Sequence, residues 1–203
     1  MPRRYTFFQQ VRGRAQSIVL DGGDAFFASP GKKAMKKTRI AGVMRNARTI
    51  LHAYNYMGYH GMGLGPGDLQ FGVDELKSFL KSAKFPIICS NLVEKATGKT
   101  VFEKTKVITV GGVRFGVYGV ILDSINRGYK ARVLGEKYDL LNALDTTKKV
   151  VAELRPNCDV LIGLSHVNMI DNKKISNEVK GIDVILDPYS QYGNKAVWVT
   201  EGE

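Results

Sequence analysis

Short apolar runs that end at polar residues constrain the fold of this chain more than any other feature. SIVL (17–20) leads into DGGD (21–24), DVLIGL (159–164) leads into Ser165 and His166, and IDVIL (182–186) leads into Asp187. Runs of this length between polar segments are typical of buried strands, and strand ends of one sheet converge on one edge, where open α/β sheets bind ligands. Asp24, His166 and the 187–191 stretch are therefore expected to meet.

A carboxylate, an imidazole and further oxygen or nitrogen donors at one sheet edge suit a divalent cation such as Zn, Mn, Fe or Mg. Other interpretations of the same residues stay open. A lone histidine such as His166 is more often a hydrogen-bonded structural residue than a metal ligand, and Asp24 could cap a loop or a helix.

Apolar periodicity and turn residues predict the remaining elements. Helices are expected over 3–15, over 32–56 with Gly58 or Gly61 at the end, after a cap at Asp74, and over 145–154 before Pro156. Strands are expected at PIIC (86–89) and AVWV (196–199), with a hairpin of KVITV and VRFGVYGVIL around Gly111 and Gly112. GMGLGPGDLQFG (61–72) is expected to be a loop, and 128–135 an exposed loop. The prediction is one domain over 1–203, of α/β or layered α+β class with mixed sheets flanked by helices.

The chain is basic, with 30 Lys and Arg against 19 Asp and Glu among 203 residues and a formal charge of +11. Such a charge attracts polyanions in general and identifies no partner. The densest basic cluster is Lys32, Lys33, Lys36, Lys37 and Arg39, which is either a solvated helix face or an anion-binding site. Cys89 and Cys158 lie in apolar runs and are expected to be buried free thiols. No apolar stretch is long enough for a membrane span, and the first residues lack a secretory signal.

Five sequence pieces, in order, resemble the 5'-nucleotidase and UDP-sugar hydrolase branch of the calcineurin-like metallophosphoesterases. They are LDGGDAFF, MGYHGMGLGPGDLQFG, FPIICSNL, VITVGGVRFGVYGVI and CDVLIGLSHVNMIDNKKISNEVKGIDVILDPYSQ. The resemblance as a whole extends from about Arg3 to Gln191. The resemblance implies a β-sandwich flanked by helices, with two metal ions at the sheet edge that hold an attacking hydroxide.

The resemblance assigns some metal-ligand positions to residues that can still fill them. Asp24 matches the metal-bridging Asp of the family's first Gly-Asp pair, and His166 matches the ligating His of its Ser-His pair. Gln191 falls where members have the last His of a Gly-His-Ser-His run or, in some, a Gln ligand. Tyr189 stands at the penultimate His position, and a phenol ligates poorly at neutral pH because its pKa is about 10.

The family's Gly-Asn-His-Glu motif reads Gly65, Pro66, Gly67 and Asp68 in this sequence. The resemblance therefore places Pro66 at the metal-binding Asn and Gly67 at the transition-state His, and Gln70 stands where nucleotidases have the Asp that pairs with that His. The opening Asp-x-His strand and the C-terminal nucleotide-recognition domain have no counterpart in the chain. An unpaired edge beside 17–20 is therefore expected. Self-association into a homo-oligomer is the favoured way to cover it, and the N-terminal helix or a rearranged segment near AVWV are the alternatives.

The sequence predicts a 5'-nucleotidase-like domain with an eroded metal site that binds at most one divalent cation weakly and has weak or no phosphohydrolase activity. One alternative is an active metal-dependent nucleotidase completed by upstream sequence, and another is an anion-binding module that uses the basic face. A nucleotide or phosphorylated small molecule is the expected partner, and nucleic acid is not expected. The resemblance implies an extracytoplasmic location.

Overall fold

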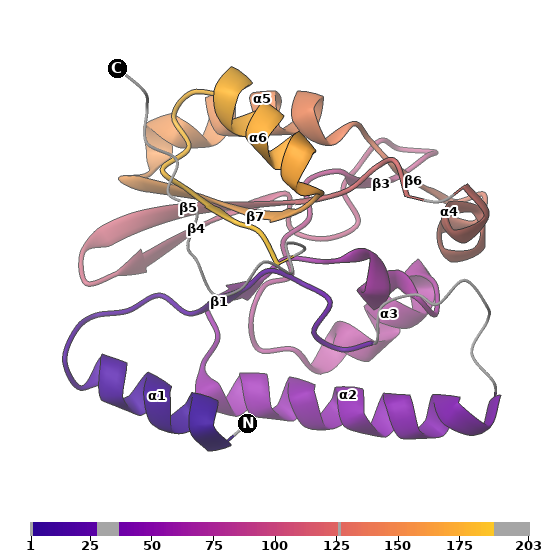
Figure 1. Cartoon of the computed structure of the whole chain (residues 1–203), viewed down its shortest axis with the longest axis horizontal. Helices are drawn as coiled ribbons and strands as arrows, with labels where there is room; N and C mark the ends of the chain where they lie inside the picture. Colours follow the sequence, from indigo (N-terminus) through magenta and orange to yellow (C-terminus); the bar gives the residue numbers. More distant parts are fainter. Residues whose placement is uncertain (1, 28–36, 126, 189–203) are drawn as a thin grey trace.

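The computed structural model describes residues 2–27, 37–125 and 127–188 (Figure 1). Its helices are α1 (Pro2–Arg12), α2 (Lys37–Met57), α3 (Val73–Phe79), α4 (Arg127–Leu134), α5 (Ala143–Leu154) and α6 (Met169–Glu178). Its strands are β1 (Leu20–Asp21), β2 (Gly61–Met62), β3 (Leu92–Glu94), β4 (Thr105–Val110), β5 (Val113–Ile121), β6 (Tyr138–Leu140), β7 (Val160–His166) and β8 (Val184–Leu186). Short 3-10 turns occupy Pro66–Leu69, Leu80–Ser82 and Arg155–Asn157.

The main sheet has four strands in the order β4-β5-β7-β8. The β4–β5 pair is an antiparallel hairpin closed at Val110 and Val113, whereas β5–β7 and β7–β8 are parallel. The two parallel connections need crossovers, and α5 and α6 supply them. Because β5 and β7 are buried along most of their length, their sequences are nearly continuous runs of apolar residues.

A second, smaller layer of extended chain packs against the main sheet. In it β1 pairs in parallel with β2, and Met62 forms an isolated parallel bridge to Ile87. Ile88 lies between the two layers with Val117, Ile162 and Leu164 from the main sheet. The fold is thus a mixed β-sandwich, and the expected fold class is confirmed.

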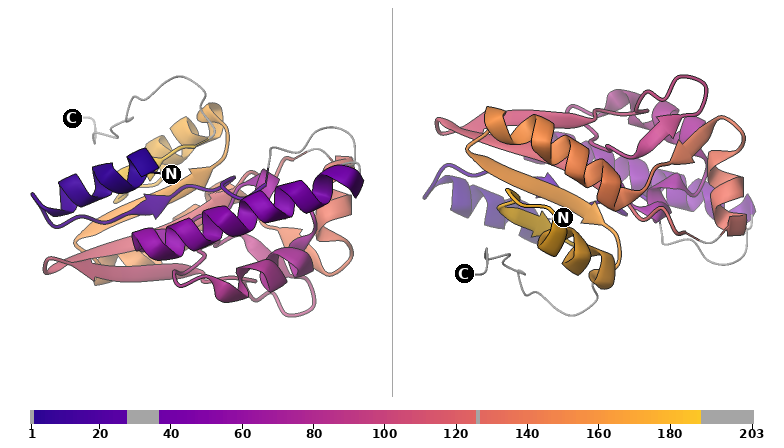
Figure 2. Two further views of the ribbon diagram at one scale, coloured as in Figure 1. Left: turned by 90° about the horizontal axis from the view of Figure 1, so that it is seen from below. Right: turned by 90° about the horizontal axis from the view of Figure 1, so that it is seen from above.

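Helices cover both outer faces of this sandwich (Figures 1 and 2). On one side α5 and α6 bury Val150, Leu154 and Ile175 against the main sheet. On the other side α2 and α3 close a core rich in aromatic rings, in which Phe27 and Phe71 meet edge-on with ring centroids 4.9 Å apart. Within the described ranges, no helix is both long enough and apolar enough to cross a bilayer.

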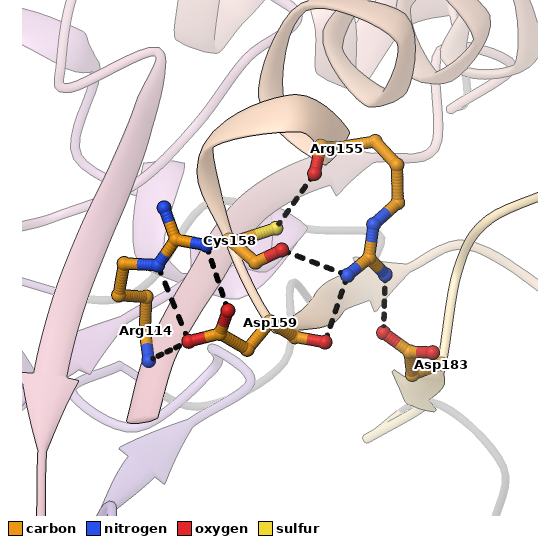
Figure 3. Close-up of polar contacts among 5 residues, drawn as sticks. All are labelled: Arg114, Arg155, Cys158, Asp159 and Asp183. Atoms are coloured by element: carbon orange, nitrogen blue, oxygen red, sulfur yellow. Dashed lines mark hydrogen bonds and ion pairs between the residues drawn. The ribbon is translucent and has the colours of Figure 1, made fainter. Parts of the chain in front are cut away.

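An arginine network joins the N-terminal ends of β5, β7 and β8 in the main sheet (Figure 3). Arg114 at the start of β5 forms an ion pair with Asp159, which precedes β7. Arg155 donates to the carbonyls of Cys158, Asp159 and Gly181 and forms an ion pair with Asp183, just before β8. The planar guanidinium therefore fixes the α5–β7 turn relative to β8.

Several expected elements are confirmed, with shifted boundaries. The hairpin around Gly111 and Gly112 forms, the helix expected from residue 145 begins at Ala143, and the helix expected from residue 32 is described from Lys37. Gly58, at a φ of 67°, follows the last residue of α2, as one of the two expected stops. The run at 17–20 gives a strand of two residues, and the expected strand at 196–199 lies outside the described residues.

Three expectations are wrong. Residues 128–135 were expected to be a loop, but 127–134 form α4, whose Val133 and Leu134 are buried in the core. Asp74 does not cap α3, because Gly72 occupies the cap and Asp74 binds Tyr138 and Lys137 instead. PIIC is extended but does not form a continuous strand. It makes only isolated bridges, from Ile87 to Met62 and from Ile88 to Glu103.

Replacing Arg155 with lysine should lower the free energy of unfolding by about 1–2 kcal/mol, because an ammonium group cannot bridge several carbonyls and a carboxylate at once. Urea unfolding of Arg155→Lys measures the change. The control is Arg127→Lys, at an exposed position at the start of α4. Equal stability of the two variants would show that the network does not hold the strand ends together.

Candidate functional site

The structure brings Asp24 and His166 together at the polar end of the sandwich. Asp24 lies three residues beyond β1, and His166 is the last residue of β7, so they come from the two facing layers. The Asp24 Oδ2 and His166 Nε2 atoms are 3.3 Å apart. The sandwich thus brings together Asp24 and His166, the two residues that the sequence predicted to meet, close enough to bind one ligand.

A buried carboxylate organises the two loops that form this site. Asp68, in the turn after β2, is completely buried and accepts hydrogen bonds from the backbone N–H groups of Asp24 (2.7 Å), Gly65 (3.1 Å) and Phe26 (3.3 Å). Burial and the nearby charge of Asp24 raise the pKa of Asp68 to about 7, against the opposing effect of these N–H donors. Asp68 therefore acts as a clasp between the loop after β1 and the loop after β2.

The backbone of Asp24 is held in an uncommon conformation by that clasp. Its φ is 56°, in the left-handed region that Asp tolerates better than most non-glycine residues. Its side chain turns toward the β2 loop, where the Gly67 N–H donates to Asp24 Oδ1 at 2.6 Å. Both carboxylate oxygens of Asp24 therefore have protein partners, Gly67 on one side and His166 on the other.

Glycine at 65 and 67 makes this close approach possible. A Cβ atom on Gly65 would lie 2.2 Å from Asp24 Oδ1 and 2.5 Å from His166 Cε1, and one on Gly67 would lie 2.8 Å from Asp24 Oδ1. The intervening Pro66 presents its carbonyl to the hydroxyl of Tyr129 on α4. The loop thus surrounds Asp24 with backbone groups instead of side-chain donors.

His166 is buried, with 3% of its side chain exposed. Burial lowers the pKa of its imidazole, but the hydrogen bond to Asp24 and the charges of Asp24 and Asp68 outweigh burial, so the net pKa is raised. The raised pKa favours an imidazolium paired with the Asp24 carboxylate. A cation that binds here must displace that proton.

A metal centre needs several ligating side chains around each ion. Among the described residues, no group of three or more His, Cys, Asp or Glu side chains is arranged to hold a metal ion. The side chains of Asp24 and His166 face each other, whereas both carboxylate oxygens of Asp68 accept hydrogen bonds from backbone N–H groups. Gln191 and Tyr189 lie outside the described residues, so whether Gln191 adds a third ligand stays a prediction.

The basic cluster of the sequence is only partly described. Lys32, Lys33 and Lys36 lie outside the described residues, and Lys37 is described in its backbone as the first residue of α2. Arg39 is exposed near the beginning of that helix. An anion site at these residues therefore stays a prediction.

Sequence reasoning missed a second support of the site, built from tyrosines. Tyr54 of α2 donates from its hydroxyl to Asp21 Oδ2 at 2.7 Å, and Asp21 Oδ1 accepts from the Gly23 N–H at 3.0 Å. Arg4 of α1 donates to the hydroxyls of Tyr54 and Tyr59. Burial and the charge of Asp21 raise the pKa of Tyr54, which keeps the phenol protonated as a donor. The sequence around Tyr54 does not predict its contact with Asp21, because the two residues lie far apart in the chain.

No protein-family model matches the chain. Among curated proteins, the 5'-nucleotidase of Vibrio cholerae is 24% identical over 200 residues, which cover 95% of this chain and 34% of that protein. The 5'-nucleotidase of Mus musculus is 27% identical over 200 residues, covering 93% of this chain and 32% of that protein. The chain therefore spans about a third of the length of these relatives.

Solved structures agree on the fold. The 5'-nucleotidase precursor of Thermus thermophilus superposes with a TM-score of 0.72 at 25% identity, over 92% of this chain and 35% of that chain. A calcineurin-like phosphoesterase of Bacillus subtilis superposes with a TM-score of 0.71 at 19% identity, over 92% of this chain and 62% of that chain. The resemblance seen in the sequence is therefore confirmed: relatives named 5'-nucleotidases and solved calcineurin-like phosphoesterases cover most of this chain. Members of this family are metal-dependent, and a role of Asp24 and His166 as metal ligands in this chain stays a prediction.

The clasp predicts a distinct pH dependence of stability in this metallophosphoesterase fold. The folded pKa of Asp68, about 7, lies above the ordinary value of about 3.9, so the folded state keeps a proton that the unfolded state has lost. The contribution of Asp68 to stability is therefore full below pH ~4 and is lost as pH rises through ~7. In Asp68→Asn this decline should become shallower, by up to about 1.4 kcal/mol per pH unit.

Urea unfolding at a series of pH values compares the slopes, not the absolute stabilities, because Asn cannot accept all three backbone bonds. Glu136→Gln, at an exposed position after α4, is the control and should keep the wild-type slope. A slope unchanged in Asp68→Asn would show that Asp68 is ionised in the folded protein across this range.

Proposed function

We propose that this chain is a 5'-nucleotidase-like metallophosphoesterase domain whose dinuclear metal site is eroded, so that its phosphohydrolase activity is weak or absent. One contact carries the proposal. The Gly67 N–H binds Asp24 Oδ1 at 2.6 Å, at the position to which the resemblance assigns a transition-state histidine. A backbone amide there neither ligates a metal nor supplies an imidazole to the developing charge on phosphorus.

The environment of Asp24 supports this conclusion. A carboxylate that bridges two metal ions must direct both oxygens to the ions, with further ligands around them. Here one oxygen accepts from Gly67 and the other faces His166, and Pro66 has no side-chain donor at the position of the metal-binding Asn. Loss of a single supporting ligand costs about 10–100-fold in affinity or activity, so several losses remove most of the function.

The residual ligand set that we propose is Asp24, His166 and Gln191, which would hold one divalent cation weakly. The raised pKa of His166 works against binding, since the imidazole must lose its proton before it can ligate. Metal affinity should therefore rise with pH. We propose nucleotides as the substrate class, because relatives named 5'-nucleotidases cover nearly the whole chain. The extracytoplasmic location implied by the resemblance stays a prediction.

Purified chain with added Mn²⁺ or Zn²⁺ should hydrolyse nucleoside monophosphates hardly above the uncatalysed background. Removal of one electrostatic stabiliser of a transition state lowers a rate by about 10²–10³, and this site lacks more than one of the family's groups. Phosphate release with and without EDTA measures the activity. Strong turnover that EDTA abolishes, and that Asp24→Asn also abolishes, would identify an active enzyme and overturn the proposal.

Restoring the side chains assigned by the resemblance should strengthen metal binding. In the double variant Pro66→Asn/Gly67→His, an amide oxygen becomes available near Asp24, and the added Cβ at 67 forces the Asp24 carboxylate away from the backbone N–H. Calorimetric titration with Mn²⁺ should show at least about tenfold tighter binding than wild type. Pro66→Ala/Gly67→Ala, which adds bulk without donors, is the control. Equal affinity in all three proteins would contradict a metal site at this position.

A further inference from the structure

Most of the net positive charge of the chain lies in its first 57 residues. They contain 11 of the 30 Lys and Arg but only Asp21 and Asp24 of the 19 acidic residues. Neither α1 nor α2 contains an Asp or Glu. The rest of the chain, with 19 basic and 17 acidic residues, is nearly neutral. The charge asymmetry is therefore a property of one part of the chain.

The helices of this segment form one outer layer of the molecule. Figure 1 shows α1 and α2 along the same side of the sandwich, and both face the viewer in the view from below (Figure 2, left). Contacts between α1 and the end of α2 hold the layer together: Tyr5 and Tyr56 have ring centroids 5.4 Å apart, and Arg12 donates to the Gly58 carbonyl at 2.9 Å. We call this surface the α1/α2 layer.

The exposed arginines of the α1/α2 layer lack acidic partners. In the part of the chain that the structure describes, ion pairs link Arg114 to Asp159, Arg155 to Asp183 and Lys148 to Glu178, but none includes an Arg or Lys of α1 or α2. The exposed arginines of this layer and its flanking turn are Arg3, Arg4, Arg14, Arg39, Arg45 and Arg48, of which Arg4 binds the hydroxyls of Tyr54 and Tyr59. Ion pairs therefore compensate part of the positive charge on the main-sheet side, whereas no ion pair in the described ranges compensates the arginines of this layer.

Aromatic side chains accompany the arginines. Phe7 of α1 is 59% exposed and Tyr56 of α2 is 76% exposed. On α2, Arg45, His52 and Tyr56 are spaced by seven and four residues, which places them on one outward stripe of the helix. Basic and aromatic side chains on helices that lie in one plane are the combination found at the headgroup level of lipid bilayers.

We propose that the α1/α2 layer docks on an anionic lipid bilayer. Each Lys or Arg beside an anionic leaflet strengthens binding about fivefold at moderate salt. Two helices side by side offer a flat contact, whereas single-stranded nucleic acid is held in grooves that follow its backbone. The layer covers the face opposite α5 and α6, so the rest of the sandwich would point away from the lipid (Figure 1). The inference is independent of the activity of the Asp24 site.

Sedimentation with vesicles tests the proposal. The wild-type chain should bind vesicles of phosphatidylcholine with added phosphatidylserine and not vesicles of phosphatidylcholine alone. Binding should disappear at about 1 M salt, where the Debye length is about 3 Å. In Arg45→Gln/Arg48→Gln the partition coefficient should fall about 25-fold, and Arg3→Gln/Arg14→Gln on the other helix should have a similar effect.

The matched control is Lys173→Gln/Lys180→Gln, which removes the same charge from exposed positions in and just after α6. It should bind like wild type, and all variants should unfold at the same temperature. An equal loss in the control would show that net charge alone drives binding and would overturn the assignment to the layer. Failure to bind anionic vesicles, or tighter binding to a single-stranded RNA oligonucleotide that the Arg45/Arg48 variant weakens, would overturn the lipid partner.

Discussion

The buried carboxylate of Asp68 is the interaction on which the polar end of this molecule depends. An unpaired carboxylate with no exposed surface would be very costly, and three backbone N–H groups from two loops offset that cost. These same bonds fix the turn after β1 against the turn after β2. The positive φ of Asp24 and the approach of Gly65 to His166 follow from the two loops being held this closely.

The clasp also makes the conformation of these loops independent of the side chains at 66 and 67. Asp68 accepts from the backbone N–H groups of Asp24, Phe26 and Gly65, so the clasp needs no donor side chain at Pro66 or Gly67. Stability of the sandwich comes from the apolar residues between its layers, such as Ile88 and Leu164. Fold and catalytic equipment therefore rest on different residues, and one can be retained while the other is lost.

The sequence predicted well where a segment carries its own periodicity. The hairpin around Gly111 and Gly112 and helix α5 are specified by local turn chemistry and apolar spacing, and both form. Prediction failed where tertiary contacts decide the conformation. Glycines at 128 and 135 suggested a loop, but burial of Val133 and Leu134 stabilises α4, whose Tyr129 reaches the site loop. PIIC has strand composition, but its neighbours offer it only isolated bridges.

At the site, the sequence by itself determined which side chains are present: Asp24 and His166 carry polar groups, and Pro66 and Gly67 have no donor side chain. It also placed Asp24 and His166 just after apolar strands, although these strands belong to two facing layers and not to one sheet. Only the tertiary structure decided what surrounds Asp24 and His166. The pairing of Asp24 with His166, the Gly67 N–H on its other oxygen and the clasp of Asp68 all join segments far apart in the chain. Such contacts depend on how two layers pack, which local pattern does not encode.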